Sequence, residues 1–373
     1  MRQRIYLDHA ATTPMLPSVV EAMRPWVELS FGNPSSLYAE GREAREAVDS
    51  ARQTLAQALG CEFGEVIFTS SGTEAVNLAI LGVALGNLDP QRTRVLFSAA
   101  EHHCVLHTRP ILKRLGYKVE FVRVDKRART DLDRLDQMLG PDVLLVSAMS
   151  ANNELGTLNE VSAIGDAARK VGSLFFCDRV QKSEKVGIED LACFAAHKLN
   201  GPKGAGALFI RAGTKMKPII AGGGQEREMR AGTENVAAIV GFAEAVSQHV
   251  RLKVEFEAAK LAAKTAFVSK LNELAIPGLS FTVEPLSNNI LSGHVHLRIA
   301  GRSAETMLIK LDRAGVSASS GAACSSGSIE PSHVLLAAGY SEAEAREGLR
   351  FTFGITNTPD EGVRAAQLIA NAC

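Results

Sequence analysis

The chain has 373 residues, and its 41 basic and 41 acidic side chains balance to a formal net charge of zero. This balance leaves no global field to attract nucleic acid or an anionic membrane surface. The amino terminus lacks an apolar stretch suited to a signal peptide, and no apolar run approaches the roughly 18 residues of a membrane-spanning helix, so we expect a cytoplasmic protein.

The chain is longer than a single core usually organises, which predicts two domains. We expect a large domain at 16–249 and a small one formed by 1–15 and 250–373. In the large domain, helical patterns alternate with short apolar runs, as in an α/β fold with a mainly parallel sheet buried on both faces. The expected strands are 66–68, 95–97, 119–122, 143–146, 174–177, 192–194 and 207–210.

The small domain is expected to open with a long helix over 251–274. Phe256, Ala263, Phe267 and Leu271 fall on one helical stripe of that segment, and a Pro-Gly pair at 277–278 follows it. The rest mixes strands, such as 294–298, with amphipathic helices, a composition suited to an α+β unit. Six cysteines are scattered without the Cys/His spacing of a zinc site, so we expect reduced thiols and no metal.

Polar candidates follow four of the expected strands. Backbone amides at a helix start that contains Gly72 and Thr73 can bind phosphate, although an ordinary capped helix has the same sequence. His102 stands either at the ligand-binding edge of the sheet or as a buried hydrogen-bonding residue. The polar residues after these four strands are expected to meet at one edge of the sheet. They predict a binding site formed by Gly72, Thr73, His102, Asn153, Asp178 and Gln181.

Lys198 comes twenty positions after Asp178, just beyond another apolar run. A lysine amine can condense with the aldehyde of pyridoxal phosphate, and an aspartate that keeps the ring nitrogen protonated turns the ring into an electron sink. Gly201 and Pro202 would fix the backbone after the lysine. A surface lysine before a loop is the alternative for Lys198 taken alone.

Taken together, these residues resemble the fold-type I pyridoxal-phosphate enzymes, within them the class V aminotransferases, and among those the cysteine desulfurases. The similarity covers nearly the whole chain. It is carried by ordered blocks at 6–14, 31–36, 222–226, 230–233, 319–327, 331–335 and 349–354.

The resemblance implies roles for individual residues. Lys198 would bond covalently to pyridoxal 5'-phosphate, Asp178 would pair with its ring nitrogen, Gln181 would bond the ring oxygen, and His102 would stack on the ring and act in catalysis. Gly72, Thr73 and His197 would hold the phosphate, together with Thr233 from the second subunit of a homodimer. Asn153, beside the cofactor, and Arg350 would bind the carboxylate of the substrate L-cysteine.

Cys324 decides the expected reaction. Every residue from Ser317 to Ser328 is Ser, Gly, Ala or Cys, which predicts a mobile loop. A thiolate on that loop could take the sulfur of cysteine as a persulfide and leave alanine. A small buried cysteine is the alternative. The resemblance implies sulfur transfer to protein acceptors such as an iron-sulfur scaffold, or to other thiolation acceptors.

The chain departs from the family pattern in three places, which favour a non-catalytic relative, and two alternative functions stay open. Ala195 stands where a serine is expected to donate to the phosphate, Arg179 replaces a small residue, and the segment from Gln181 to Lys198 is several residues short. Selenocysteine lysis or transamination, in which Cys324 is dispensable, is one alternative. A non-catalytic relative that serves as a binding partner is another. Cys104 adds a second thiol near His102.

Overall fold

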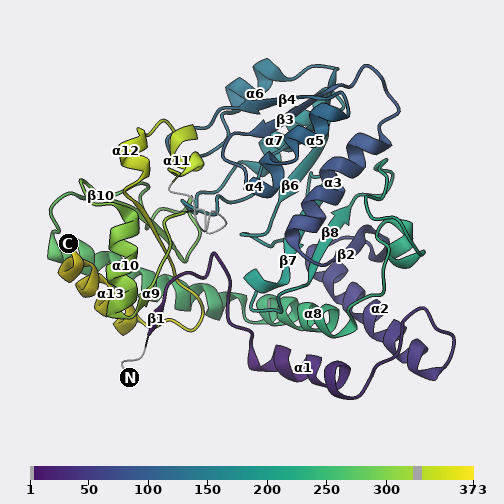
Figure 1. Ribbon diagram of the computed structural model, residues 1–373, viewed down its shortest axis with the longest axis horizontal. Helices are drawn as coiled ribbons and strands as arrows, with labels where there is room; N and C mark the ends of the chain where they lie inside the picture. Colours follow the sequence, from purple (N-terminus) through teal and green to yellow (C-terminus); the bar gives the residue numbers. More distant parts are fainter. Residues whose placement is uncertain (1–3, 322–329) are drawn as a thin grey trace.

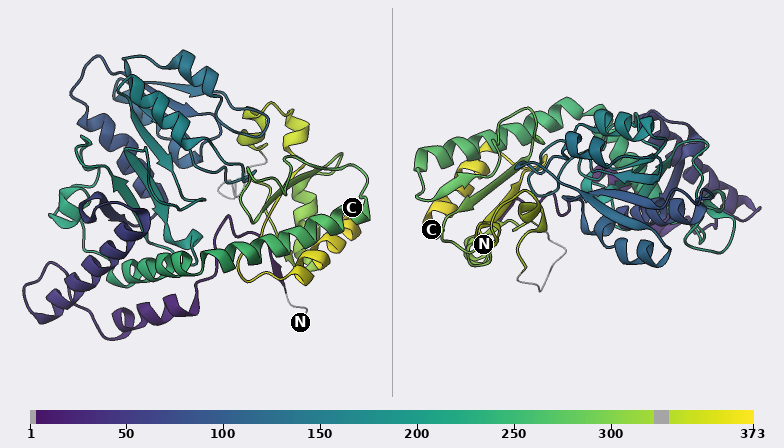
Figure 2. Two further views of the ribbon diagram at one scale, coloured as in Figure 1. Left: turned by 180° about the vertical axis from the view of Figure 1, so that it is seen from behind. Right: turned by 90° about the horizontal axis from the view of Figure 1, so that it is seen from above.

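The computed structural model describes residues 4–321 and 330–373, so Cys324 lies outside the described residues. Figure 1 shows two lobes side by side, a larger one built around a sheet and a smaller one that contains both chain ends. The view from above in Figure 2 shows the same two lobes. The boundaries expected near residues 16 and 249 stay predictions.

Within the described residues, the larger lobe contains a seven-stranded sheet with the order β2-β8-β7-β6-β5-β3-β4. The strands β7, β6, β5, β3 and β4 are mutually parallel, whereas β8 runs antiparallel to both β7 and β2. Strands other than β8 therefore end at the same edge. The predicted mainly parallel sheet is confirmed, with strands β2 (Val66–Thr69), β3 (Arg94–Ser98), β4 (Lys118–Val122), β5 (Val143–Ser147), β6 (Leu174–Asp178), β7 (Leu191–Ala195) and β8 (Gly206–Ile210).

Helices cover both faces of this sheet, because alternate side chains of each strand enter opposite cores. Ile67 packs with α3 on one face, whereas Val66 and Phe68 pack with α2 and α8 on the other. The elements around the sheet are α1 (Pro17–Glu28), α2 (Ala39–Leu59), η1 (Phe63–Glu65), α3 (Gly72–Gly86), α4 (His103–Leu106), α5 (Arg109–Arg114), α6 (Leu132–Met138), α7 (Val161–Lys170), η2 (Ala196–Lys198), η3 (Gln225–Glu228) and α8 (Val236–Arg251).

The smaller lobe contains an antiparallel sheet, β12-β10-β9, and a parallel pair in which β1 lies beside β11. The pairing of β1 brings the start of the chain into this lobe. Its elements are β1 (Ile5–Tyr6), α9 (Lys253–Leu274), β9 (Leu279–Phe281), β10 (His294–Ile299), α10 (Ala304–Ala314), β11 (Val316–Ser317), α11 (His333–Ala337), α12 (Glu342–Ala345), β12 (Gly348–Thr352) and α13 (Pro359–Ala372).

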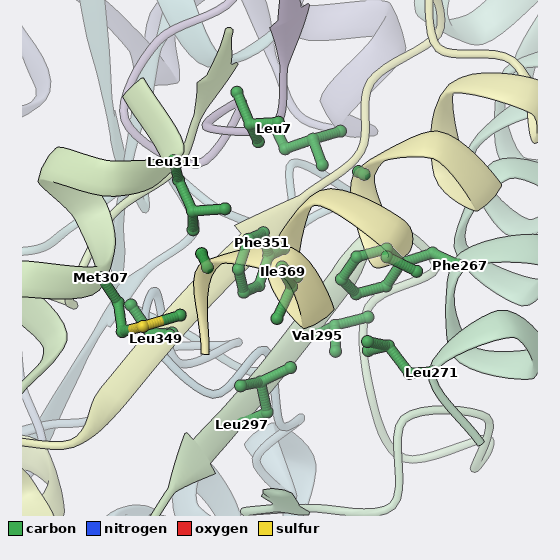
Figure 3. Packing of buried hydrophobic residues seen from close by; sticks show 14 of the residues in the cluster. Leu7, Phe267, Leu271, Val295, Leu297, Met307, Leu311, Leu349, Phe351 and Ile369 are labelled. Atoms are coloured by element: carbon green, nitrogen blue, oxygen red, sulfur yellow. The ribbon is translucent and has the colours of Figure 1, made fainter. Parts of the chain in front are cut away.

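The core of the smaller lobe lies between α9, α13 and the strands (Figure 3). Ala263, Phe267 and Leu271 of the predicted helical stripe are buried there, and the Phe267 and Phe351 rings lie 5.2 Å apart between centroids. The predicted start of this helix is slightly wrong, because Arg251 still belongs to α8 and α9 begins at Lys253. No helix in the described ranges has the length and apolar character needed to cross a bilayer.

A separate apolar cluster joins the two lobes beside the carboxyl edge of the large sheet. Ala100 and Leu155 from the larger lobe pack there with Val334 and Leu335 from the smaller one. An isolated bridge between Thr157 and Ile290 adds backbone pairing across the same junction. These contacts fix the position of the smaller lobe relative to the sheet edge where the predicted site residues lie.

Candidate active site

A cavity of about 210 Å³ opens at this sheet edge, between the lobes. Strand ends, the start of α3 and the turn η2 supply its walls from the larger lobe, and β12 supplies Arg350 from the smaller one. The structure therefore brings together most of the residues predicted from the sequence, namely Gly72, Thr73, His102, Asn153, Asp178, Gln181, His197, Lys198 and Arg350.

Lys198 ends η2, directly after β7. Its Nζ donates to the carbonyl oxygens of Ala10 and Ala11, the latter at 2.8 Å, so the amine is held against the amino-terminal segment. The backbone amide of Gly201 donates to Ala196 O at 3.0 Å and closes the turn around the lysine. Two backbone carbonyl groups therefore hold the amine at the edge of the cavity, and the closed turn fixes the backbone that carries the lysine.

Asp178 is the buried last residue of β6. Burial raises the pKa of its carboxyl group, while a hydrogen bond from the Val180 amide at 2.9 Å and the positive charge of Lys198 oppose the rise. A cationic partner inside the cavity would favour the ionised carboxylate further. The protonated nitrogen of a pyridine ring is such a partner.

The start of α3 forms a second wall. Ser71 caps the helix by accepting from the Glu74 amide at 3.1 Å. Gly72 has little space, because a Cβ built there would lie 3.1 Å from Val180 and 3.4 Å from Ala195. Backbone amides at this amino terminus line the cavity with Thr73, an arrangement that suits a phosphate group. Ala195, which stands where a serine was expected to donate to the phosphate, contributes only a methyl group.

His102 stands at the start of α4, and its Nδ1 accepts from the Cys104 amide at 3.2 Å. The Cys104 Sγ atom lies 2.9 Å from the same nitrogen, so the second thiol is held against this ring. Burial, together with the charge of Lys198, lowers the pKa of His102 to about 4. The ring is therefore neutral near pH 7, and a neutral flat ring can pack against an aromatic ligand. His197 is also neutral, because burial lowers its pKa to about 4.

Arg350 and Asn153 leave polar atoms unused at the cavity. Arg350 donates from Nη1 to the Asn153 carbonyl oxygen at 2.9 Å and from Nη2 to Asp8 Oδ1 at 2.8 Å. Across the part of the chain that the structure describes, Arg350 Nε and Asn153 Oδ1 are buried without a hydrogen-bond partner. Buried groups of this kind are normally satisfied, so a polar ligand is expected between them. Asp8 was not among the site residues predicted from the sequence.

The guanidinium of Arg179, one of the three departures from the family pattern, does not pair with the carboxylate of Asp178. Its guanidinium forms a buried ion pair with Glu189 instead. The short connection between β6 and β7, residues 179–190, contains no helix or strand, and all of it lies in the described range. The cysteines Cys177 and Cys193 are buried in the cores on the two faces of the sheet.

One predicted residue does not line this cavity, and another is not described. Thr233 is exposed on the surface of the single chain. Cys324 is outside the described residues, but Ser319 at the described edge of its segment pairs with Arg350 through two backbone hydrogen bonds, at 3.1 and 2.7 Å. The described part of the segment that leads to Cys324 therefore pairs with the backbone of Arg350 on β12. Among the residues described, no group of three or more metal-ligating side chains is present.

The cavity fits pyridoxal 5'-phosphate. It offers an amine, a buried carboxylate, a neutral flat ring and a helix amino terminus, and its unused polar atoms stand beside a guanidinium. These are the groups that a pyridine ring with an aldehyde and a phosphate requires. The fold and this cavity define a pyridoxal-phosphate enzyme of fold-type I.

The comparison with known proteins places the chain more narrowly. The family model for aminotransferase class-V matches residues 5–364. A cysteine desulfurase IscS of Dictyoglomus turgidum is 40% identical over 97% of this chain and 92% of its own length. A cysteine desulfurase of a Frankia species is 41% identical over 99% and 91%.

Solved structures agree with this assignment. A NifS-like protein superposes with a TM-score of 0.91 at 31% identity and covers 99% of both chains. SspA, solved in complex with cysteine, superposes with a TM-score of 0.81 at 31% identity, over 94% of this chain and 99% of its own. The chain belongs to the class-V aminotransferase family and, within it, to the cysteine desulfurases.

Proposed function

We propose that this protein converts L-cysteine to L-alanine and takes the sulfur onto Cys324 as a persulfide. The observation that carries the proposal is the position of Arg350. Its unsatisfied Nε and the unsatisfied Oδ1 of Asn153 favour a polar substrate group in the cavity, and its backbone pairs with Ser319 at the start of the segment that leads to Cys324.

The residues that would hold pyridoxal 5'-phosphate follow from the cavity walls. Lys198 would bond to its aldehyde, Asp178 would pair with the ring nitrogen, and His102 would lie against the ring. The phosphate would sit at the start of α3, beside Thr73 and His197, with Gly72 leaving the backbone accessible, and Gln181 would bond the ring oxygen. When bound, the cofactor supplies an electron sink for the substrate α-carbon.

Protein groups perform the remaining steps. The guanidinium of Arg350 and the amide of Asn153 would orient the substrate carboxylate, and the Nζ of Lys198 would move the α-proton. The thiolate Sγ of Cys324 would form a bond to the substrate sulfur as the carbon–sulfur bond breaks. The electron pair of that bond stays on carbon, which takes a proton to become the methyl group of alanine, so sulfur is oxidised and carbon is reduced.

We also propose that the active protein is a homodimer. Thr233 is exposed here, away from the cavity, where a second copy could reach it. Large apolar side chains are exposed along the nearby α1–α2 region, a feature typical of a protein interface. They are Val27, Leu29, Phe31, Leu37 and Tyr38.

The division into domains and the fate of the sulfur are further parts of this proposal. Residues 16–249 would form the cofactor-binding domain, and 1–15 with 250–373 the small domain. Ile5 and Leu7 support this division, because they share one core with α9 and α13. By the family resemblance, we propose a cytoplasmic protein that passes persulfide sulfur to an iron-sulfur scaffold or another thiolation acceptor.

The test is product analysis with the purified holoenzyme. L-cysteine should yield alanine and, with a thiol reductant present, sulfide in equal amounts. Cys324→Ala should retain the cofactor spectrum and lose both products, whereas the matched variant Cys61→Ala, half-buried and remote from the cavity, should keep them. Undiminished turnover by Cys324→Ala would remove the persulfide from the mechanism.

A further inference from the structure

A second cavity, of about 530 Å³, lies behind Lys198. We call it the rear cavity. Ala10, Gln181 and Lys198 line both this cavity and the active-site cavity, so the two spaces meet at the lysine. The walls used in the following argument are His9, Leu55, Phe242, Val246, Lys260 and His294.

The short connection between β6 and β7 explains why this space exists. Parallel neighbouring strands are usually joined by a crossover that carries a helix and covers one face of the sheet. Strands β6 and β7 are parallel, yet residues 179–190, which are all described, form no helix between them. Gln181 and Lys185 line the rear cavity instead, so an irregular segment borders this space where a crossover helix is usual.

Two buried histidines with unused hydrogen-bonding capacity line this cavity. His9 is 7% exposed and His294 is 6% exposed. In the described ranges, the Nε2 of His294 has no hydrogen-bond partner. The His9 ring lies beside the backbone of Tyr6 and the side chain of Asn357, in poor hydrogen-bond geometry. An imidazole that loses its contacts with water without gaining others is costly, so these nitrogens require a ligand or water in the rear cavity.

The charges that line the rear cavity favour an anion. Five lysines line it against two glutamates, and Glu257 already pairs with Lys260 at 2.9 Å. Positive charges also act on the His294 ring, from Arg350, Lys264, Lys260 and Lys198. Of these four, Lys260 and Lys198 line the rear cavity. A small anion would gain both the hydrogen bonds of the imidazoles and the attraction of these ammonium groups.

The opposite wall is apolar. Leu55 of α2 and Phe242 and Val246 of α8 are buried and line the same space. A purely inorganic anion would leave this wall unused. A molecule with a carboxylate at one end and an aliphatic chain at the other would use both surfaces.

From this juxtaposition we propose that the rear cavity is a second binding site, distinct from the substrate position, for a small carboxylate with an aliphatic tail. The carboxylate lies toward His9, His294 and Lys260, and the tail lies against Leu55, Phe242 and Val246. This assignment is independent of the desulfurase reaction, because none of these six residues lines the active-site cavity.

The test uses hexanoate as the probe and calorimetric titration of the cofactor-loaded protein as the measurement. Hexanoate should bind at millimolar concentration, while 1-hexanol and acetate, which lack the charge and the tail respectively, should bind at least about tenfold more weakly, equivalent to about 1.4 kcal/mol. Equal binding of hexanoate and hexanol would refute an anion site.

Matched variants locate the probe. Lys260→Gln and Lys270→Gln each break an ion pair on α9, with a glutamate three residues away, and the two lysines are similarly exposed at 21% and 18%. Only Lys260 lines the rear cavity. Lys260→Gln should weaken hexanoate binding about tenfold, and Lys270→Gln should leave it unchanged.

One further pair and one cavity-filling variant guard against misfolded variants. His294→Asn should weaken binding, whereas His296→Asn, on the same strand but lining neither cavity, should not. Val246→Phe should fill the rear cavity and abolish binding in a protein whose melting temperature and cofactor spectrum show that it is folded. Binding that survives Lys260→Gln and Val246→Phe would overturn the proposal, as would the absence of any binding to the unsubstituted protein.

Discussion

The buried ion pair between Asp8 and Arg350 yields a quantitative prediction. The Arg350 side chain is 2% exposed and that of Asp8 17%, with a nitrogen–oxygen distance of 2.8 Å. Removing one partner of a buried pair costs about 3–5 kcal/mol, because the other charge stays buried. Asp8→Asn keeps an oxygen that can accept from Nη2, so we expect a loss at the lower end, about 3 kcal/mol of unfolding free energy.

The measurement is urea unfolding followed by circular dichroism, with the surface pair between Arg4 and Asp312 as the matched control. These side chains are 54% and 68% exposed, so Asp312→Asn should cost less than about 1 kcal/mol. Double-mutant cycles with Arg350→Met and Arg4→Met separate the pairwise coupling from other effects of each change. Similar losses in Asp8→Asn and Asp312→Asn would refute the reasoning that burial makes the first pair strong.

Four other outcomes are expected. Borohydride reduction of the holoenzyme should fix the cofactor mass on a peptide that contains Lys198, and Lys198→Ala should abolish this adduct; an adduct on another lysine would contradict the assignment. Asp178→Asn should bind the cofactor yet form alanine at least about 100-fold more slowly, since the ring loses its charged partner; a near-normal rate would exclude that role. Thr233→Val should weaken cofactor binding about tenfold in a fluorescence titration, by removing one hydrogen bond across the dimer; unchanged affinity would argue against a shared site. Burial lowers the pKa of His296 from 6.5 to about 3, so this ring favours the folded state above pH 6.5 and that stability is lost as the pH falls toward 3. In His296→Asn, the acid loss of unfolding free energy below pH 6.5 should shrink by up to about 1.4 kcal/mol per pH unit, and an unaltered pH dependence would contradict a buried neutral ring.

The sequence was a good guide to the strands but not to their arrangement. Short apolar runs identify strands when a sheet is buried on both faces, and this held for all seven. The reversed direction of β8 could not be foreseen, because Gly206–Ile210 is as apolar as its parallel neighbours. The break between α8 and α9 was missed because Leu252 lies between two good helix formers, Arg251 and Lys253, with no glycine or proline to mark it.

For the site, the geometry of parallel strands explains why so many residues could be placed together. Asp178 ends β6 and Asn153 follows the neighbouring strand β5, and such strand ends meet at one sheet edge. The contact between Asp8 and Arg350 could not be predicted in this way, because it joins positions 342 residues apart through the packing of the smaller lobe. The rear cavity was equally hidden, since a shortened connection reveals that a helix is missing but not what remains in its place.

The amino-terminal segment acquires a physical role from these contacts. Its carbonyl oxygens at Ala10 and Ala11 hold the amine of Lys198 from the larger lobe, while the carboxylate of Asp8 holds the guanidinium of Arg350 from the smaller one. One short stretch of backbone therefore sets the positions of two groups that must act on the same substrate. Because a misplacement of about 1 Å can cost 100-fold in rate, any movement between the lobes that shifts this segment would alter both groups together.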